Sequence, residues 1–158
     1  MNRHTIFVCV LSLAIMVIAT GCSGAAVKAQ ELTFDQLFAD PDKYNGKTIA
    51  IEGFYFHGFE IIVLGEKLEY SGYTPGHLVP KGRMVWIEGG VPTKEVYDQL
   101  YQQTMMGPEE RYGEIRLEGK FEYGGKFGHL GAYGSQIAPS KVELLVWSPP
   151  AAPAAMSR

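Results

Sequence analysis

The sequence predicts an all-β domain with minor helices, in which five strands close into a Greek-key barrel. Segments with strand-like alternation of apolar and polar residues recur between residues 47 and 147, separated by glycine- or proline-containing turns. An apolar–x–apolar–Glu–Gly pattern also occurs three times, at 49–53, 85–89 and 115–119. Because the glycine of each copy permits a bulge or tight bend, we expect strongly curved strands.

The clearest strand covers residues 114–123, where charged and apolar residues alternate without interruption. This period of two predicts an apolar row facing a core and a charged row facing water. Gly124-Gly125 follows and is typical of a hairpin turn that needs positive φ. Two further strands are expected at 59–64, which is nearly all apolar, and at 142–147.

Two short helices are expected beside the strands. The first would begin at Thr33, which has the spacing of a capping box to Gln36. The second would begin at Thr93 and end before Gly107, because apolar residues recur four positions apart over 96–101. It would lie between the third and fourth strands of the barrel.

The first 21 residues have the pattern of a cleavable export signal. Arg3 precedes an apolar run from Ile6 to Ala19, which is shorter than the roughly 20 apolar residues of a spanning helix. The run ends at Ala-Thr-Gly-Cys, with the cysteine at position 22. This tetrapeptide resembles the lipobox of bacterial lipoproteins. The resemblance implies cleavage after residue 21 and an acyl chain on Cys22 that anchors an extracytoplasmic protein to the cell membrane or outer membrane. An ordinary signal peptide with an unmodified Cys22 is the alternative.

The domain limits follow from composition. Residues 22–31 are expected to form a short tether, 32–147 the folded domain, and the Pro/Ala-rich residues 148–158 a disordered tail. The chain has two cysteines, of which Cys9 belongs to the signal and Cys22 would carry lipid. The folded domain is therefore expected to have no disulfide.

The order of these elements resembles the OB-fold, a five-stranded Greek-key barrel, over residues 47–147. The chain also resembles a group of small secreted bacterial OB-fold proteins. That likeness rests on Tyr-Asn-Gly-Lys at 44–47, Gly-Phe-Glu at 58–60 and Gly-His-Leu-Gly at 128–131. An SH3-like barrel or a split β-sandwich is the alternative fold.

Charge and motifs argue against several functions. The chain has 14 Lys and Arg against 17 Asp and Glu, with no basic block, so nucleic acid is not an expected partner. The sequence contains no Gly-x-Ser-x-Gly, His-Glu-x-x-His or Ser-x-x-Lys motif. No histidine after Cys22 has a second histidine or carboxylate two or four positions away, so we expect neither a metal nor another cofactor.

The remaining candidates for function are aromatic and histidine side chains near the expected turns. OB-folds usually bind ligands on the face of their second and third strands and on nearby loops, which makes these side chains candidate ligand contacts. The candidate set is Tyr55, Phe56, His57, Phe59, Tyr73 and His129.

We therefore expect a non-enzymatic binding module, with an envelope protein, a glycan or a small ligand as its partner. The alternatives are a hydrolase that pairs a histidine with a carboxylate, a cation site between Glu52 and Glu118, and a nucleic-acid-binding OB-fold. A further alternative is that the aromatic residues form the barrel core and close its ends.

Overall fold

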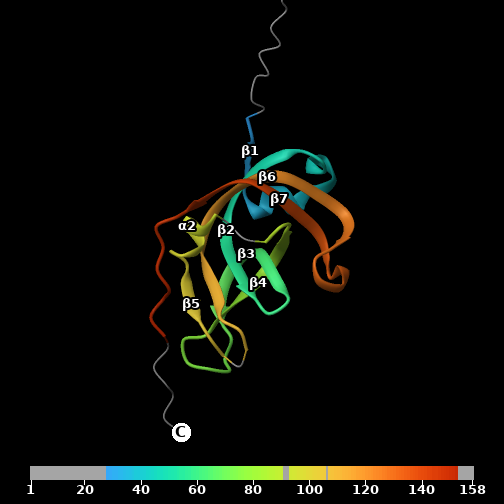
Figure 1. Cartoon of the computed structure of the whole chain (residues 1–158). Coiled ribbons are helices and arrows are strands. Elements are labelled where there is room, and N and C mark those ends of the chain that lie inside the picture. Colours follow the sequence, from blue (N-terminus) through green and yellow to red (C-terminus); the bar gives the residue numbers. More distant parts are fainter. Residues whose placement is uncertain (1–27, 91–92, 106, 153–158) are drawn as a thin grey trace, which may run out of the picture.

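The computed structural model describes residues 28–90, 93–105 and 107–152. The chain is mostly β, as the alternating pattern predicts, with only short helices (Figure 1). The expected signal peptide and Cys22 lie outside the described residues, as do residues 153–158. Within the described ranges, no helix is long and apolar enough to cross a bilayer.

In the described part of the chain, seven strands and four short helical segments follow one another. The strands are β1 (Gln30–Leu32), β2 (Thr48–Gly58), β3 (Ile61–Tyr70), β4 (Leu78–Ile87), β5 (Tyr101–Gln103), β6 (Glu110–Phe127) and β7 (Tyr133–Leu144). The helical segments are α1 (Phe34–Ala39), α2 (Lys94–Tyr97) and the 3-10 turns η1 (Pro41–Tyr44) and η2 (His129–Gly131).

All seven strands belong to one sheet, in which five close into a ring. The order is β1-β2-β3-β4-β7-β6-β5, and an additional pairing of β2 with β6 joins the two sides. The ring therefore consists of β2, β3, β4, β7 and β6. The prediction of five strands misses β1, which pairs in parallel with β2, and β5, which pairs antiparallel with β6.

The pairings around the ring differ greatly in length. β2 and β6 are in register from Thr48↔Lys120 to His57↔Arg111. The parallel pairing of β4 with β7 has only two matched positions, Trp86↔Gln136 and Ile87↔Ile137. A backbone hydrogen bond from Glu88 N to Ile137 O, 2.9 Å long, extends this short seam.

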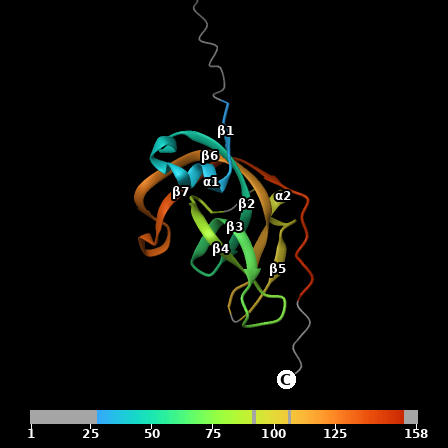
Figure 2. The ribbon, with the colours of Figure 1, turned by 180° about the vertical axis from the view of Figure 1, so that it is seen from behind.

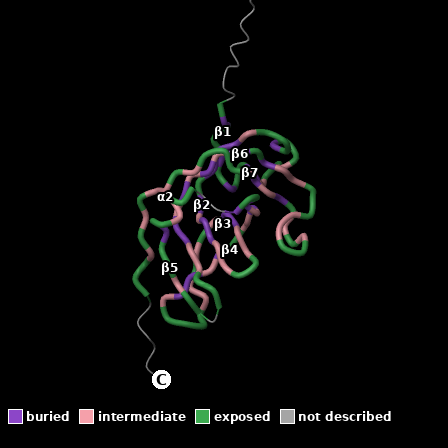
Figure 3. Tube along the Cα trace, in the orientation of Figure 1, coloured by how far each residue is buried: buried purple, intermediate pink, exposed green. Residues whose placement is uncertain are grey.

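The main core lies inside the ring. Buried positions recur along the curved strands between less buried ones (Figure 3). Ile115, Leu117 and Phe121 of β6 are fully buried, so the predicted apolar row of this strand is confirmed. The capping box at the start of α1 is also confirmed, because Thr33 Oγ1 accepts from Gln36 N and Gln36 Oε1 accepts from Thr33 N. Leu37 of α1 is buried in the same core.

A second apolar cluster covers the outer face of the sheet. Its buried members are Phe56, Val63, Leu78 and Tyr112. Val63 is paired with Phe56 on one side and with Trp86 on the other, so the three side chains lie on the same face of the sheet. Their neighbours along each strand point to the opposite face, into the ring. The sheet therefore carries apolar side chains on both faces where β2, β3 and β4 run side by side.

The second expected helix is shorter than predicted. α2 ends at Tyr97, its N-cap Thr93 makes no side-chain capping hydrogen bond, and Tyr101 instead pairs with Tyr112 in the sheet. The rings of Tyr101 and Tyr112 stack with centroids 5.8 Å apart, a contact that outweighs the local helical pattern.

The expected turn at Gly124-Gly125 is also misplaced. β6 continues to Phe127, with a register shift between Tyr123 and Phe127 where Gly124 has φ of 82°. The chain reverses only after Phe127, through η2. Glycine at position 124 therefore serves a bulge rather than the hairpin turn.

The two ends of the described chain leave opposite ends of the molecule (Figure 2). β1 begins at Gln30, so the last two residues of the expected tether belong to the sheet. At the other end, residues 148–152 have no regular secondary structure, but Tyr70 Oη donates to Pro150 O over 2.8 Å. Trp147 follows the end of β7 and packs its ring against Phe54 at 5.3 Å.

Candidate functional site

A groove of about 530 Å³ lies on the outer face of the sheet, beside the second apolar cluster. It is open to solvent and most of its lining is apolar. Residues from β2, β3, β4, β6 and β7 and from three loops contribute: Phe56, Ile61, Tyr73, His77, Val79, Pro80, Met84, Met105, Glu110, Ala132 and Tyr133. Its volume is within the usual range for small-ligand sites.

Strand alternation explains the apolar walls of this groove. Phe56 and Met84 point to the outer face, whereas Tyr55 and Val85 next to them are buried in the ring core. Tyr133, at the start of β7, packs against Trp86 with ring centroids 5.3 Å apart. Met84 is half-buried and Met105 is exposed, and flexible thioether side chains of this kind adapt to differently shaped ligands.

A hydrogen-bonded polar group lies at the edge of the groove. His77 Nε2 and Gln103 Nε2 are each 2.8 Å from Glu110 Oε2. Gln103 also accepts from Leu78 N at 3.0 Å and donates to Leu78 O at 2.6 Å, which fixes β5 to the start of β4. Two side chains, His77 from the β3–β4 loop and Gln103 from β5, thus hold the Glu110 carboxylate in place.

His77 is 4% exposed, and the second nitrogen of its ring is unpaired. Because a carboxylate accepts hydrogen bonds, Nε2 carries the proton shared with Glu110. Nδ1 is buried and has no hydrogen-bond partner. With the proton on Nε2, Nδ1 is therefore a buried acceptor without a partner among the described residues.

A second, smaller hollow of about 260 Å³ adjoins the groove and contains two histidines. His129 Nε2 lies 3.3 Å from Glu60 Oε2 and ties the β6–β7 turn to the β2–β3 turn. His57 lines the same hollow, and burial lowers its pKa. Ile61 lines both hollows, so the two are adjacent.

The turns beside this second hollow carry strained backbone. Glu60 and Leu130 have φ of 59° and 53°, in the left-handed region that favours glycine. Phe59 and Leu130 are 68% and 92% exposed at the tips of their turns. Neither side chain lines the groove or the second hollow.

The structure separates the six predicted ligand contacts into four groups. Phe56 and Tyr73 line the groove, and His57 and His129 line the adjacent hollow. Phe59 lies outside both. Tyr55 is fully buried and donates from Oη to Gly90 O at 2.8 Å, and burial raises the pKa of its hydroxyl far above the usual range. Tyr55 is therefore a core residue, and the prediction that it contacts ligand is wrong.

Sequence reasoning missed the His77–Glu110 pair and both methionines of the groove. A signal for the groove was present in β4, where Met84, Val85, Trp86 and Ile87 are consecutive apolar residues. Consecutive apolar residues in a strand place apolar side chains on both faces of the sheet. Either both faces are then covered by other parts of the protein, or one of them is available to a ligand. No such signal marks Glu110, because its partner His77 lies 33 positions away.

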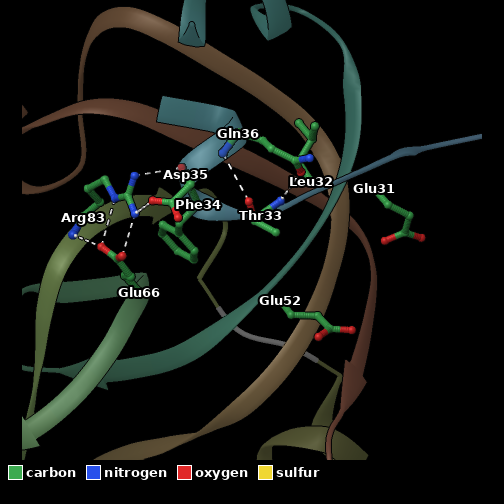
Figure 4. A pocket seen from close by; sticks show the side chains of 9 residues that line it. All are labelled: Glu31, Leu32, Thr33, Phe34, Asp35, Gln36, Glu52, Glu66 and Arg83. Carbon is green, nitrogen blue, oxygen red and sulfur yellow. Dashed lines mark hydrogen bonds and ion pairs between the residues drawn. The ribbon is translucent and has the colours of Figure 1, made fainter. Parts of the chain in front are cut away.

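A third hollow, of about 470 Å³, is organised by Arg83 and is shown in Figure 4. The guanidinium donates to both oxygens of Glu66 at 2.6–2.9 Å, to Asp35 at 2.6 Å and to the backbone oxygen of Phe34 at 3.1 Å. These hydrogen bonds lower the pKa of Glu66 to about 2. Arg83 thus fastens α1 to β3 and β4, and its charge is already matched.

The expected alternatives for cation binding find no support in the geometry. In the β2–β6 register, Glu52 is opposite Arg116, and Glu118 is opposite Ala50. Arg116 also forms ion pairs with Glu31 and Glu143. Within the described ranges, no three His, Cys, Asp or Glu side chains are arranged to hold a metal ion.

Comparisons with known proteins identify no relative of this chain. No protein-family model, no curated protein and no solved structure matches it. The groove and its lining residues are therefore the basis for assigning a function.

Proposed function

We propose that the protein is a membrane-anchored lipoprotein whose barrel, of the OB-fold type, is a non-enzymatic binding module at the cell envelope. The observation that carries this proposal is the apolar groove on the outer face of the sheet, which contains Phe56 and Tyr73. An apolar concavity with a few fixed polar groups is the common form of a ligand site.

The strand order of the ring supports the OB-fold assignment. Its first strand, β2, pairs with both β3 and β6, and the parallel pairing of β4 with β7 completes the ring. A five-stranded Greek-key barrel requires these neighbours. The groove extends over the second and third strands of the ring and the loop before its fifth strand, where ligands of this fold class usually bind.

The position of the groove agrees with an anchor at Cys22. β1 leaves the molecule at the end opposite to the β3–β4 loop, which contributes Tyr73 and His77 to the groove (Figure 1). At roughly 3.5 Å per residue, residues 22–29 would span at most about 28 Å. A barrel on this tether would turn the groove away from the lipid surface and toward envelope partners.

The anchor is tested by replacing Cys22 with alanine in the full-length chain. We expect the unaltered protein to incorporate labelled palmitate and to sediment with membranes, whereas Cys22→Ala loses the label and stays in the soluble exported fraction or keeps its signal. Cys9→Ala is the matched control and should behave like the unaltered protein. Unchanged labelling and sedimentation of Cys22→Ala would contradict lipidation at this residue.

The groove is tested with the detergent-solubilised protein and an envelope extract. We expect Tyr73→Ala and Met84→Asp to lose the molecules that the unaltered protein retains, because both residues line the groove. Phe59→Ala is the control, since Phe59 is exposed outside the groove. If Phe59→Ala loses the bound molecules while both groove variants retain them, the binding site lies outside the groove. Thermal melts of every variant separate misfolding from lost contacts.

One observation favours a second candidate, a hydrolase. His129 has a carboxylate 3.3 Å away in a concave site, as a general base requires. The described residues that line this hollow include no serine, threonine or cysteine, so the base would have to activate water. The test is whether the intact protein hydrolyses an ester, an amide or a phosphodiester. Hydrolysis that is abolished in His129→Gln would support the hydrolase and contradict the binding proposal.

A further inference from the structure

The charge of the groove is unusual for such an apolar surface. With histidine counted as neutral in the formal charge at pH 7, Glu110 is the only charged residue among the described residues that line it. The Glu110 side chain is 19% exposed, so solvent screens its charge only partly. No Lys or Arg is among those lining residues to compensate it.

Glu110 retains one oxygen for a ligand. Its Oε2 accepts from His77 and Gln103, whereas Oε1 makes no hydrogen bond to any other described residue. A carboxylate oxygen accepts hydrogen bonds and carries negative charge, so this edge of the groove is complementary to a donor that carries positive charge.

The rest of the groove suits the body of such a ligand. The rings of Tyr73, Tyr133 and Phe56 line the groove, and aromatic rings attract cations at their faces and stack on flat apolar groups. The polarizable thioethers of Met84 and Met105 adapt to an aliphatic or aromatic chain. An anionic ligand would meet the Glu110 carboxylate without a compensating cation.

We propose that the groove selects ligands in which an ammonium group is attached to an apolar or aromatic body, with the ammonium at Glu110 and the body against the tyrosine and methionine side chains. This inference rests on the proposed function, because it names the ligand class of the same groove.

Three probes of the same shape test the selection: 3-phenylpropylamine, 3-phenylpropan-1-ol and 3-phenylpropanoate at pH 7. The readout is the ¹³C-methyl NMR signals of Met84 and Met105, which report on the groove itself, in the detergent-solubilised full-length protein. We expect the amine to bind about tenfold more tightly than the alcohol, as one charge-assisted hydrogen bond would give, and the carboxylate to bind more weakly than both.

Glu110→Gln and Glu109→Gln form a matched pair of variants. Glu109 neighbours Glu110 in the chain but is 47% exposed, pairs with Arg111 and does not line the groove. Glu110→Gln should remove the preference for the amine while the alcohol still binds, and Glu109→Gln should keep the preference.

Equal binding of amine and alcohol to the unaltered protein would overturn the inference and leave the binding proposal intact. An equal loss of preference in both variants would likewise overturn it, because a general surface charge would then explain the selection. If no probe shifts the Met84 or Met105 signals, the groove is not a site for this ligand class, whereas loss of envelope binding in the groove variants would still support the proposed function. The comparison of probes needs no variant, so misfolding of Glu110→Gln would not block the test.

Discussion

Gly119 has no side chain, and this allows β6 and β7 to approach each other closely. A Cβ at this position would overlap the carbonyl oxygen of Ala138 and lie 2.9 Å from its carbonyl carbon. Both obstacles are backbone, which cannot move aside as a flexible side chain can. The register of β6 and β7 shifts beside this residue, so the glycine of the third repeated pentapeptide marks a real irregularity.

We predict that Gly119→Ala destabilises the protein by about 3 kcal/mol, because the added methyl group overpacks the β6–β7 pair. Urea unfolding followed by tryptophan fluorescence measures the loss. Gly134→Ala on β7 is the control, since nothing lies within 4 Å of a Cβ at that position and its φ is not positive. Equal urea midpoints for the two variants would show that the sheet accommodates a methyl group at position 119.

A second residue-scale prediction concerns the pH dependence that Arg83 imposes on Glu66. Hydrogen bonds from Arg83 lower the pKa of Glu66 from its usual 4.5 to about 2 in the folded protein. The unfolded chain therefore binds a proton at higher pH than the folded one, and the stabilising contribution is complete above pH 4.5 and lost between pH 4.5 and 2. Glu66→Gln should lack this contribution.

The measurement is the free energy of unfolding of the two proteins at several pH values from 7 to 2. The difference between them should be constant above pH 4.5 and shrink as the pH falls through the window. A difference that stays constant down to pH 2 would show that Glu66 titrates normally in the folded state.

Among the elements, the seam between β4 and β7 is the weakest join of the ring. It has two matched positions, whereas β2 and β6 are paired over the length of a strand. Fewer hydrogen bonds need to break for this seam to open, so local opening should begin there.

Native-state hydrogen exchange tests this difference between elements. We expect the amide of Glu88, which donates across the seam to Ile137, to exchange faster than the amides in the middle of the β2–β6 pair. Amides in the middle of β6, such as that of Leu117, provide the reference. Equal protection across both pairings would mean that the ring opens only by global unfolding.

Element prediction from sequence succeeded where the pattern was local and failed where a distant strand decided the structure. The alternation in β6 and the capping box at Thr33 are properties of neighbouring residues, and both were predicted. The segment around Tyr101 has a helical repeat, yet it becomes β5 because Tyr112 of β6 provides a stacking partner. No pattern within 96–101 contains that information.

At the scale of the whole molecule, the class of fold was predictable and the groove was only partly so. Of the aromatic residues near turns, Phe56 and Tyr73 line the groove, although Phe56 is buried and only Tyr73 is exposed. The same reasoning wrongly included Tyr55. Its side chain points into the ring, and this direction depends on the strand register, which the local sequence does not determine. The contact between His77 and Glu110 depends on how β5, β6 and the β3–β4 loop meet, which only the assembled fold determines.

The parallel pairing of β1 with β2 has a mechanical consequence for a protein held at both ends. If Cys22 is fixed in a membrane and a partner is held in the groove, tension would reach the barrel first through β1, which is only three residues long. A pull along β1 loads its hydrogen bonds to β2 in shear, and the Glu31–Arg116 ion pair shares the load. Detachment of residues 30–32 would lengthen the tether by about 10 Å before the ring is disturbed. β1 would then act as a short extensible link that protects an occupied groove from movement of the membrane.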